Sequence, residues 1–435
     1  MSKSWRPLLV ILFVALFALA CPAIFADEPK QADNQNPPAV KLNITETSLG
    51  KFGEGGIAKT LTVSPDSKRV AFVAWRGEKC FVVVDGVEGK EYDGIVRDTL
   101  VFSPDSKRVA YIARRGDKSF VVVDGVEGKE FDAIGAGTLI FSPDSKRIAY
   151  YAKRGEKCVV IVDGVEGKEY DSLGEGDPIF SPDSKRVAYT AWRGEKCLVV
   201  VDEVEGREFD GTRKGGPIFS PDSKCVAFVA ISGKKQIVVV DGAEGREYDA
   251  AFAPIFSPDS KRVAFVAISG EKWLVVVDGA EGREYDGAFA PIFSPDSKRV
   301  AYWAGRGEKR FVVFDVTEGK EFDDIEEGSL VFSPDSKRIA YGAQRGDKRF
   351  VVVDGVEGKE YGGIFTGPTF SPDSKRLAYE AWRGDKQFLV VDGVESTEYD
   401  GFVEGSRLVF DSPSKPHTLM LRDSEIFLVE IEITE

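Results

Sequence analysis

Residues 99–137 read TLVFSPDSKRVAYIARRGDKSFVVVDGVEGKEFDAIGAG, and units closely similar to this one follow each other along the chain. The letters SPDSK occur nine times without variation, at steps of 37 to 39 residues. A fixed period of this length is typical of a stack or ring of supersecondary units. A catalytic signature needs one copy, so nine identical copies indicate a structural turn. The copies begin at Ser64, Ser103, Ser142, Ser181, Ser220, Ser257, Ser294, Ser333 and Ser371.

Each unit divides into four short strands separated by turns. In residues 99–137 the strands are TLVF, RVAYIA, SFVVVDG and KEFDAI. Ser103 suits the first position of a type I turn and Pro104 suits the second. Gly116 marks the second turn and the letters VEG mark the third. No segment shows helical spacing, so we expect an all-β fold with almost no helix outside the N-terminal segment.

The four-stranded unit and its period predict a β-propeller. Nine units carry the full motif, and residues 407–433 read as a tenth unit that lacks its fourth strand. Residues 40–56 can supply that strand, because pairing both termini in one blade leaves no open sheet edge. We therefore expect about ten four-stranded blades, the last closed by both termini. Two separate rings are the alternative, although no linker divides the units.

The repeat also resembles a known family. FSPDSKRVAY followed by FVVVDG is similar to the WD40-like (PD40) repeat of TolB-type propellers, whose usual signature is SPDGKxIAF. The resemblance covers about residues 57 to 411. Serine replaces the family's glycine after SPD in all nine copies, which predicts a slightly different turn. TolB carries an additional α/β domain before its propeller where this chain has only a linker, so the resemblance implies the fold and not the role of TolB.

The first 26 residues differ in kind from the repeats. Lys3 and Arg6 precede an apolar run that ends in small residues before the acidic DEPK, a pattern typical of a secretory signal peptide. An uncleaved membrane anchor is one alternative, and a lipoprotein signal ending at Cys21 is another. We expect a signal peptide at 1–26, a flexible linker at 27–45 and the propeller at 46–435. The chain is thus expected to be exported, periplasmic or extracellular, with membrane contact only through its N-terminal segment.

Composition excludes several kinds of site. A net charge of −14 argues against nucleic acid, whose binding needs a basic face. The single histidine, His417, rules out a histidine metal cluster and is expected in a loop; no G-x-S-x-G elbow is present. The acidic letters DGVEGKEYD fit a hairpin with local charge pairs better than a calcium site. We expect no cofactor and no metal, free thiols at the cysteines of the repeats, and only polar turns at the three Arg-Gly-Asp sequences.

The repeats differ where the second strand ends and where one unit joins the next. In propellers these two loop sets share one rim, so this rim is the candidate binding face. Units five and six both bring an isoleucine and a phenylalanine to it, which predicts an apolar patch; the alternative is that these side chains pack inward. The candidate binding residues are Trp75, Trp192, Ile231, Phe252, Ile268, Phe289 and Trp382.

These features predict an exported, non-enzymatic propeller scaffold whose partner is a protein. The alternative is a propeller enzyme that acts on glycans with carboxylates at the mouth of the central channel, for which Glu326 and Glu380 are candidates.

Overall fold

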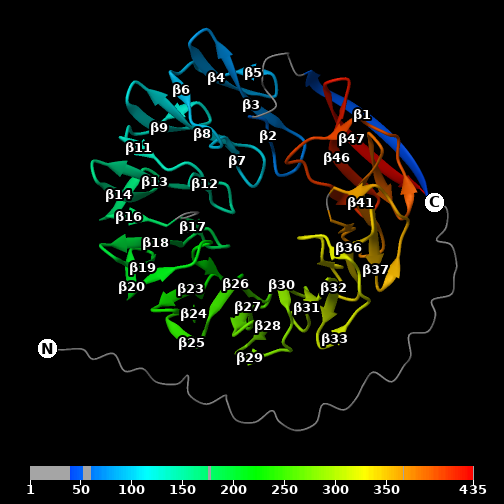
Figure 1. The fold of residues 1–435 in the computed structure, drawn as a ribbon. Helices are drawn as coiled ribbons and strands as arrows, with labels where there is room; N and C mark the ends of the chain where they lie inside the picture. The colour runs from blue at the N-terminus through cyan, green and yellow to red at the C-terminus, as the bar shows by residue number, and fades with distance from the viewer. Residues whose placement is uncertain (1–39, 52–59, 175–177, 366, 435) are drawn as a thin grey trace. The chain divides into compact units, whose positions relative to one another are not determined.

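The computed structural model describes residues 40–51, 60–174, 178–365 and 367–434. The expected signal segment and most of the expected linker lie outside these ranges. All regular elements within them are strands, which form ten antiparallel sheets arranged in a ring (Figure 1). The prediction of an all-β propeller with ten blades is therefore confirmed. None of the described residues forms a helix that could span a membrane.

Blades 1 to 9 are numbered by their SPDSK motif, and blade 10 contains the C-terminus. The second and third strands of each blade are six to ten residues long and form its middle. The second strands are β3 (Val70–Arg76), β8 (Val109–Arg115), β13 (Ile148–Arg154), β18 (Val187–Arg193), β23 (Val226–Ser232), β27 (Val263–Ser269), β31 (Val300–Arg306), β36 (Ile339–Arg345), β41 (Leu377–Arg383) and β46 (Lys415–Arg422). The third strands are β4 (Lys79–Val84), β9 (Lys118–Val123), β14 (Lys157–Val162), β19 (Lys196–Val201), β24 (Lys235–Val240), β28 (Lys272–Val277), β32 (Lys309–Phe314), β37 (Lys348–Val353), β42 (Lys386–Val391) and β47 (Glu425–Thr434).

The first strand of each blade lies toward the ring centre and the fourth lies at the periphery (Figure 1). The inner strands are β2 (Thr62–Val63), β6 (Gly94–Ile95) with β7 (Val101–Phe102), β11 (Ala133–Ile134) with β12 (Ile140–Phe141), β16 (Ser172–Leu173) with β17 (Ile179–Phe180), β21 (Gly211–Thr212) with β22 (Ile218–Phe219), β26 (Ala250–Phe256), β30 (Gly287–Phe293), β34 (Asp324–Ile325) with β35 (Val331–Phe332), β39 (Gly363–Ile364) with β40 (Thr369–Phe370), and β44 (Gly401–Phe402) with β45 (Val409–Ser412). The outer strands are β5 (Val87–Glu88), β10 (Val126–Glu127), β15 (Val165–Tyr170), β20 (Val204–Phe209), β25 (Ala243–Tyr248), β29 (Ala280–Glu281), β33 (Thr317–Glu318), β38 (Val356–Glu357), β43 (Val394–Glu395) and β1 (Lys41–Lys51).

One sequence assignment of a strand was wrong. KEFDAI in residues 129–134 was expected to be a single fourth strand. Its first half belongs to the periphery of blade 2, where Phe131 bridges Ser119. Its last two residues form β11, which already pairs with β13 of blade 3. The chain crosses from periphery to ring centre between them, and a two-residue strand leaves no readable hydrophobic period.

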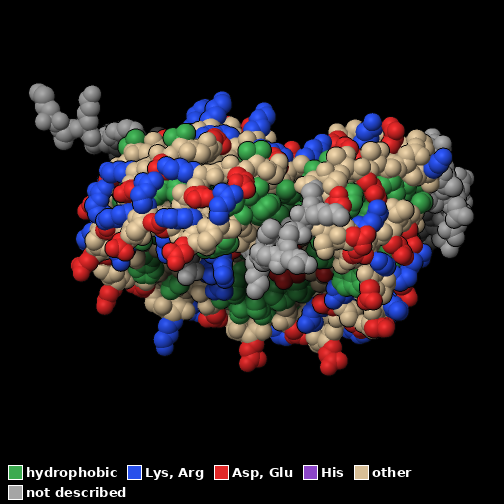
Figure 2. Space-filling view, turned by 90° about the horizontal axis from the view of Figure 1, so that it is seen from above, with side chains coloured by type: hydrophobic (Ala, Val, Ile, Leu, Met, Phe, Trp, Pro, Cys, Tyr) green, Lys and Arg blue, Asp and Glu red, His purple; other side chains and the backbone are tan. Residues whose placement is uncertain are grey.

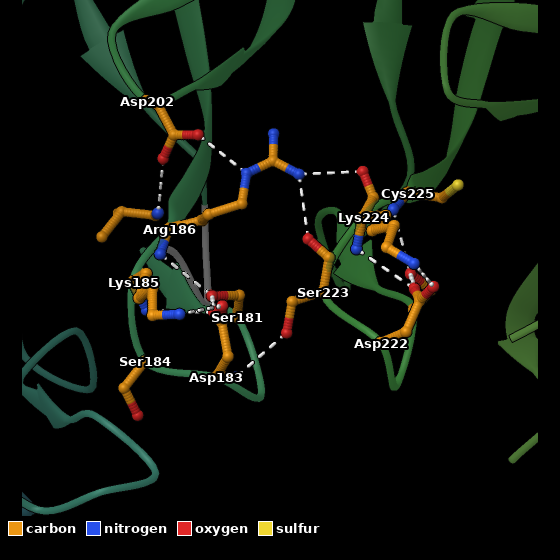
Figure 3. Close-up of polar contacts among 12 residues, drawn as sticks. Ser181, Asp183, Ser184, Lys185, Arg186, Asp202, Asp222, Ser223, Lys224 and Cys225 are labelled. Atoms are coloured by element: carbon orange, nitrogen blue, oxygen red, sulfur yellow. Dashed lines mark hydrogen bonds and ion pairs between the residues drawn. The ribbon is translucent and has the colours of Figure 1, made fainter. Parts of the chain in front are cut away.

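The SPDSK turn has a structural role within its blade and between blades. Within blade 4 it is closed by a hydrogen bond from the Ser184 N–H to the carbonyl of Ser181 (2.8 Å). Between blades, the Asp183 N–H donates to Oγ of Ser223 in blade 5 (2.9 Å; Figure 3). The second serine of the motif has a positive φ in every copy, from 51° to 66°. Glycine favours that conformation, so serine keeps a left-handed backbone here and adds an acceptor that joins two blades.

The arginine after SPDSK makes a second link between blades, which we call the guanidinium bridge. Arg186 donates from Nε to Oδ2 of Asp202 in its own blade (2.8 Å). Its Nη1 donates to the carbonyl oxygens of Ser223 (3.0 Å) and Lys224 (2.8 Å) in blade 5 (Figure 3). The guanidinium carbon lies 5.4 Å from the centre of the Phe219 ring. The bridge recurs at Arg69, Arg108, Arg147, Arg262 and Arg338.

The hydrophobic core lies between neighbouring blades and is repeated around the ring. One cluster joins Ala71 and Val82 of blade 1 to Tyr111 and Phe120 of blade 2. Tyr92, from the periphery of blade 1, meets Tyr111 edge-on at 6.1 Å. Each seam therefore buries the faces of two sheets, and a blade depends on its neighbours for stability.

Blade 10 is built from both ends of the chain. β47 lies between β46 and β1, and its pairing with β1 runs from Lys41↔Thr434 to Lys51↔Glu425. β1 begins at Lys41 and so lies within residues 40–56, which were expected to supply the closing strand. Closure by both termini is thus observed.

The seam between blade 10 and blade 1 completes the ring. The Arg407 N–H donates to Oγ of Ser67 (3.0 Å), as a motif N–H does at the other seams. His417 Nε2 lies 2.7 Å from the carbonyl oxygen of Asp66. His417 is buried on β46, so its expected place in a loop was wrong. Its side chain belongs to the closing seam.

Ion pairs connect the blades at the periphery. Lys90 of blade 1 pairs with Glu127 of blade 2, and Arg115 of blade 2 binds the same carboxylate at 2.7 Å. Equivalent links between neighbouring blades involve Lys129–Glu166, Lys168–Glu205, Arg207–Glu244, Arg246–Glu281, Arg283–Glu318, Lys320–Glu357 and Lys359–Glu395. Figure 2 shows acidic and basic side chains intermingled on this surface. The carboxylates of DGVEGKEYD are therefore used in local pairs.

Glu46 on β1 takes the place of these glutamates in blade 10. It accepts a hydrogen bond from the Tyr399 hydroxyl (2.6 Å) and two from Arg422 (2.8 Å each). Glu205 is bound in the same way in blade 4, by Tyr170 and Arg193. The N-terminal strand thus reproduces the peripheral contacts of a complete repeat.

Candidate functional site

The two faces of the ring carry different turns. The SPDSK turns and the Asp-Gly turns before the fourth strand lie on one face, which we call the uniform face. Asp85 and Gly86 form one of these Asp-Gly turns, with φ values of 50° and 81° that fit a type I′ hairpin. The opposite face carries the turns between second and third strands, such as Arg115–Lys118, and the crossings between blades. We call it the variable face.

The loops that vary between repeats do not all lie where the sequence suggested. They were expected at the connection from one blade to the next. In blade 2 the loop at residues 96–100 instead interrupts the inner strand, because β6 and β7 on either side of it both pair with β8. The variable segments therefore project from the strands that surround the ring centre.

Blades 6 and 7 have shorter inner segments. Their inner strands β26 and β30 are continuous, each with a bulge at an alanine of positive φ: Ala253 at 44° and Ala290 at 48°. Pairing resumes after Phe252 in β26 and after Phe289 in β30 with its register shifted at the bulge. Both phenylalanines are half-buried.

These two phenylalanines belong to one continuous row of aromatic side chains. Phe252 stacks on Trp273 at 5.3 Å between ring centres, and Trp273 meets Phe289 at 4.8 Å. Phe289 then stacks on Trp303 at 4.2 Å. Arg213 of blade 5 covers the other end of the row, with its guanidinium carbon 3.7 Å from the Phe252 ring centre. We call these five side chains the aromatic row.

The aromatic row is neither a free patch nor a sealed core. All five side chains are half-buried, since their faces cover each other and part of each remains exposed. Burial lowers the pKa of Arg213, and its Nη1 donates to Oε1 of Gln236 (3.3 Å). The row spans three blades and presents an edge of aromatic rings next to a partly buried cation, a composition typical of binding surfaces.

Sequence reasoning found only Phe252 and Phe289 among the members of the row. Arg213, Trp273 and Trp303 were missed. A signal existed for the two tryptophans, because other repeats place Cys, Ser, Gln or Arg at the position of Trp273 and no other repeat has tryptophan at the position of Trp303. Contact between neighbouring blades brings them together, which a single repeat cannot show.

The predicted tryptophans lie in several places. Trp192 lines a cavity of about 240 Å³ together with Arg213, so this cavity borders one end of the aromatic row. Trp75 is 64% exposed and lines a cavity of about 430 Å³ with Arg97. Trp382 lies against Gly363, where an added Cβ would be 1.9 Å from its ring. The structure thus brings Trp192 near the row and leaves Trp75 and Trp382 in other blades.

The two predicted isoleucines form part of the strand framework. Ile231 lies near Gly211, with its Cδ1 at 3.3 Å from the position of an added Cβ. Ile268 is paired with Ala250 and with Trp273 in the sheet of blade 6. Both side chains are half-buried. Ile268 lies opposite Trp273 in the sheet, and neither isoleucine is among the stacked rings of the row.

The carboxylates considered for catalysis are not exposed as a pair. Glu380 is fully buried and accepts a hydrogen bond from the Thr418 hydroxyl (3.0 Å). Glu326 is half-buried and pairs with Arg349 at 3.3 Å. Burial raises the pKa of Glu326, and Arg349 opposes this shift.

A cavity of about 460 Å³ lies between blades 4 and 5 and is lined by five valines, by Phe209 and Phe228, and by charged side chains that include Arg186 and Asp241. These two rings meet edge-on at 5.8 Å. Equivalent ring pairs at the neighbouring seams, such as Tyr170–Tyr189, carry at least one hydroxyl group. The ring pair at the seam between blades 4 and 5 has none.

Comparisons with known proteins found only solved structures of low identity and low TM-score. No family model matches the chain, and no curated protein matches it. Solved structures that resemble it include one titled as the eukaryotic initiation factor, with 13% identity and a TM-score of 0.44, covering 75% of this chain and 97% of that one. TolB from Acinetobacter baumannii has 16% identity and a TM-score of 0.28, covering 51% of this chain and 61% of that one. The propeller domain of the Trilobed protease from Pyrococcus furiosus has 14% identity and a TM-score of 0.32, covering 60% and 95%. The β-propeller architecture is established by the ten sheets of the chain itself.

Proposed function

We propose that this β-propeller is an exported, non-enzymatic scaffold that binds a partner protein through its variable face. The observation that carries the proposal is the aromatic row, which joins blades 5, 6 and 7 by contacts of 3.7 to 5.3 Å. Aromatic residues and arginine are enriched in the parts of interfaces that contribute most binding energy. Export is supported by the basic and apolar pattern of residues 1–26.

The row has features that suit a protein partner. Its rings hold each other in place, so little side-chain freedom is lost when a partner covers them. The adjoining cavity beside Trp192 and Arg213 can receive one projecting side chain. Uniform repeats around the rest of the ring supply a rigid frame, and the variable segments give the specific surface.

A double variant at Phe252 and Phe289 tests the aromatic row. Changing both to leucine keeps their apolar character and removes the ring stacking. Each lost aromatic pair costs about 0.5–1.5 kcal/mol of stability, so the melting temperature is expected to fall by only a few degrees. Partner affinity is expected to fall by about 30-fold or more, as for residues at the centre of an interface.

The measurement is affinity purification of the exported protein with cross-linking, followed by titration of the partner that is recovered. Phe365→Leu is the matched control, because Phe365 is an exposed ring of blade 9 outside the aromatic row. The control is expected to retain the partner. Unchanged affinity in the double variant would contradict the proposed surface, and a collapse of the melting temperature would show that the rings are only core.

A further inference from the structure

Six blades contain the same intramolecular site for a guanidinium group. The arginine Nε lies 2.7 to 2.9 Å from an aspartate of its own blade. Its Nη1 lies 2.7 to 3.5 Å from the carbonyl oxygen of a motif serine in the next blade. A phenylalanine ring centre lies 5.1 to 5.4 Å from the guanidinium carbon. The protein thus defines a binding geometry for arginine six times.

Blade 5 keeps the acceptors of this site and lacks the arginine. Cys225 stands where the other SPDSK motifs are followed by arginine. Among the described residues, the Asp241 carboxylate has no hydrogen bond or ion pair, and the carbonyl oxygens of Ser260 and Lys261 accept none. Phe256 occupies the position of the phenylalanine and is half-buried.

The rest of this seam is built as the others are. The Asp222 N–H donates to Oγ of Ser260 (2.8 Å), the same inter-blade bond that positions the motif in other blades. Tyr248 meets Phe265 edge-on at 5.8 Å. The backbone that presents the two carbonyl oxygens is therefore held in place without a guanidinium bridge.

We propose that the seam between blades 5 and 6 binds an arginine side chain of a partner protein. The guanidinium would bind the Asp241 carboxylate and the carbonyl oxygens of Ser260 and Lys261, with its plane against Phe256. Arginine is favoured over lysine because its planar, forked donors match several fixed acceptors at once. This site lies on the uniform face and does not depend on the aromatic row.

Two properties of the seam suit an incoming arginine side chain. Asp241 is exposed, so a side chain from outside can reach it. Burial raises the pKa of the Cys225 thiol, with nearby Asp241 and Asp222 adding to the shift. The thiol therefore stays neutral and does not repel the Asp241 carboxylate.

The probe is the peptide acetyl-Gly-Arg-Gly-amide, titrated into the whole exported protein and followed by ligand-observed NMR. The citrulline peptide has nearly the same shape without the charge, and the lysine peptide has the charge without the fork. We expect the arginine peptide to bind at one site, the lysine peptide to bind more weakly, and the citrulline peptide to lose binding by about 10-fold or more.

Variants at the seam separate this site from general attraction to an acidic protein. Cys225→Arg fills the site from within and is expected to abolish peptide binding, with a higher melting temperature than Cys225→Ser. Cys225→Ser is the matched control and is expected to bind as the natural protein does. Asp241→Asn is expected to weaken binding by about 10-fold. Arg147→Ser opens an equivalent site in blade 3 and is expected to raise the stoichiometry from one to two.

The proposal is wrong if the arginine and citrulline peptides bind equally, or if no arginine peptide binds at all. It is also wrong if binding survives Cys225→Arg in a protein that melts normally. Should Cys225→Arg fail to fold, unchanged binding by Asp241→Asn overturns the proposal instead.

Discussion

A protein truncated after Glu425 is expected to lose its stable ring. Residues 426–435 contain nearly all of β47, which lies between β46 and β1 and buries Ile426, Leu428, Val429, Ile431 and Ile433. Burial of each such side chain contributes roughly 1.5–3 kcal/mol. The sum, about 7–15 kcal/mol, is comparable to the whole stability of a typical domain. Loss of cooperative melting, or a very large fall of the melting temperature, is therefore expected in calorimetry.

A matched pair of point variants shows whether the effect comes from burial. Ile431 is buried in β47 and Glu432 beside it is exposed. Ile431→Asp is expected to destabilise the protein by several kcal/mol, because it places a charge in the closing blade. Glu432→Asn is expected to change stability by less than about 0.5 kcal/mol. A truncated protein that melts where the intact one does would show that the ring is not closed by β47.

Acid is expected to open the ring at its periphery. Arg115 and then Lys90 lower the pKa of Glu127 to about 2, and Arg345 and then Lys320 do the same to Glu357. A carboxylate whose pKa is lower in the folded state stabilises it above the unfolded pKa, and this contribution is lost as pH falls toward the folded value. The melting temperature is therefore expected to stay level above about pH 5 and to fall steeply between about pH 4.5 and 2.

The repeated inter-blade pairs make this a collective effect, although each exposed pair contributes little alone. Salt of about 0.5 M screens exposed pairs and is expected to reduce the difference between neutral and acid melting temperatures. Replacing Glu127 and Glu357 by glutamine is expected to lower stability at neutral pH and to reduce its fall in acid. A melting temperature that is flat from neutral pH to about pH 2.5 would rule out these contacts as a major source of stability.

Much of the fold was predictable because every repeat has the same turn residues and the same apolar strand segments. The motif SPDSK gives a turn, the flanking runs give strands, and the period gives the ring. The inner strand was misplaced for a physical reason: β6 and β7 have two residues each, too few to show a period, and a loop divides them. The closing strand β1 lies within the predicted residues 40–56, and its pairing partner lies at the other end of the chain.

The candidate site was less predictable, because it depends on contacts between blades. Phe252 and Phe289 could be recognised as apolar residues in unusual repeats, but the stack through Trp273 crosses the seam between blades 6 and 7. His417 looked like a loop residue since its repeat has decayed, yet it lies in the closing seam. In both cases the neighbour that gives the residue its role is distant in sequence.

The central claim is that the variable face, and not the uniform one, carries the main partner. A photo-reactive amino acid placed at one exposed position on each face tests it most directly. Lys234 lies in an exposed turn of the variable face, and Lys185 lies in a SPDSK turn with its side chain 81% exposed. The account predicts that the partner recovered from cells is cross-linked from position 234 and not from position 185. Cross-linking from position 185 alone would contradict it.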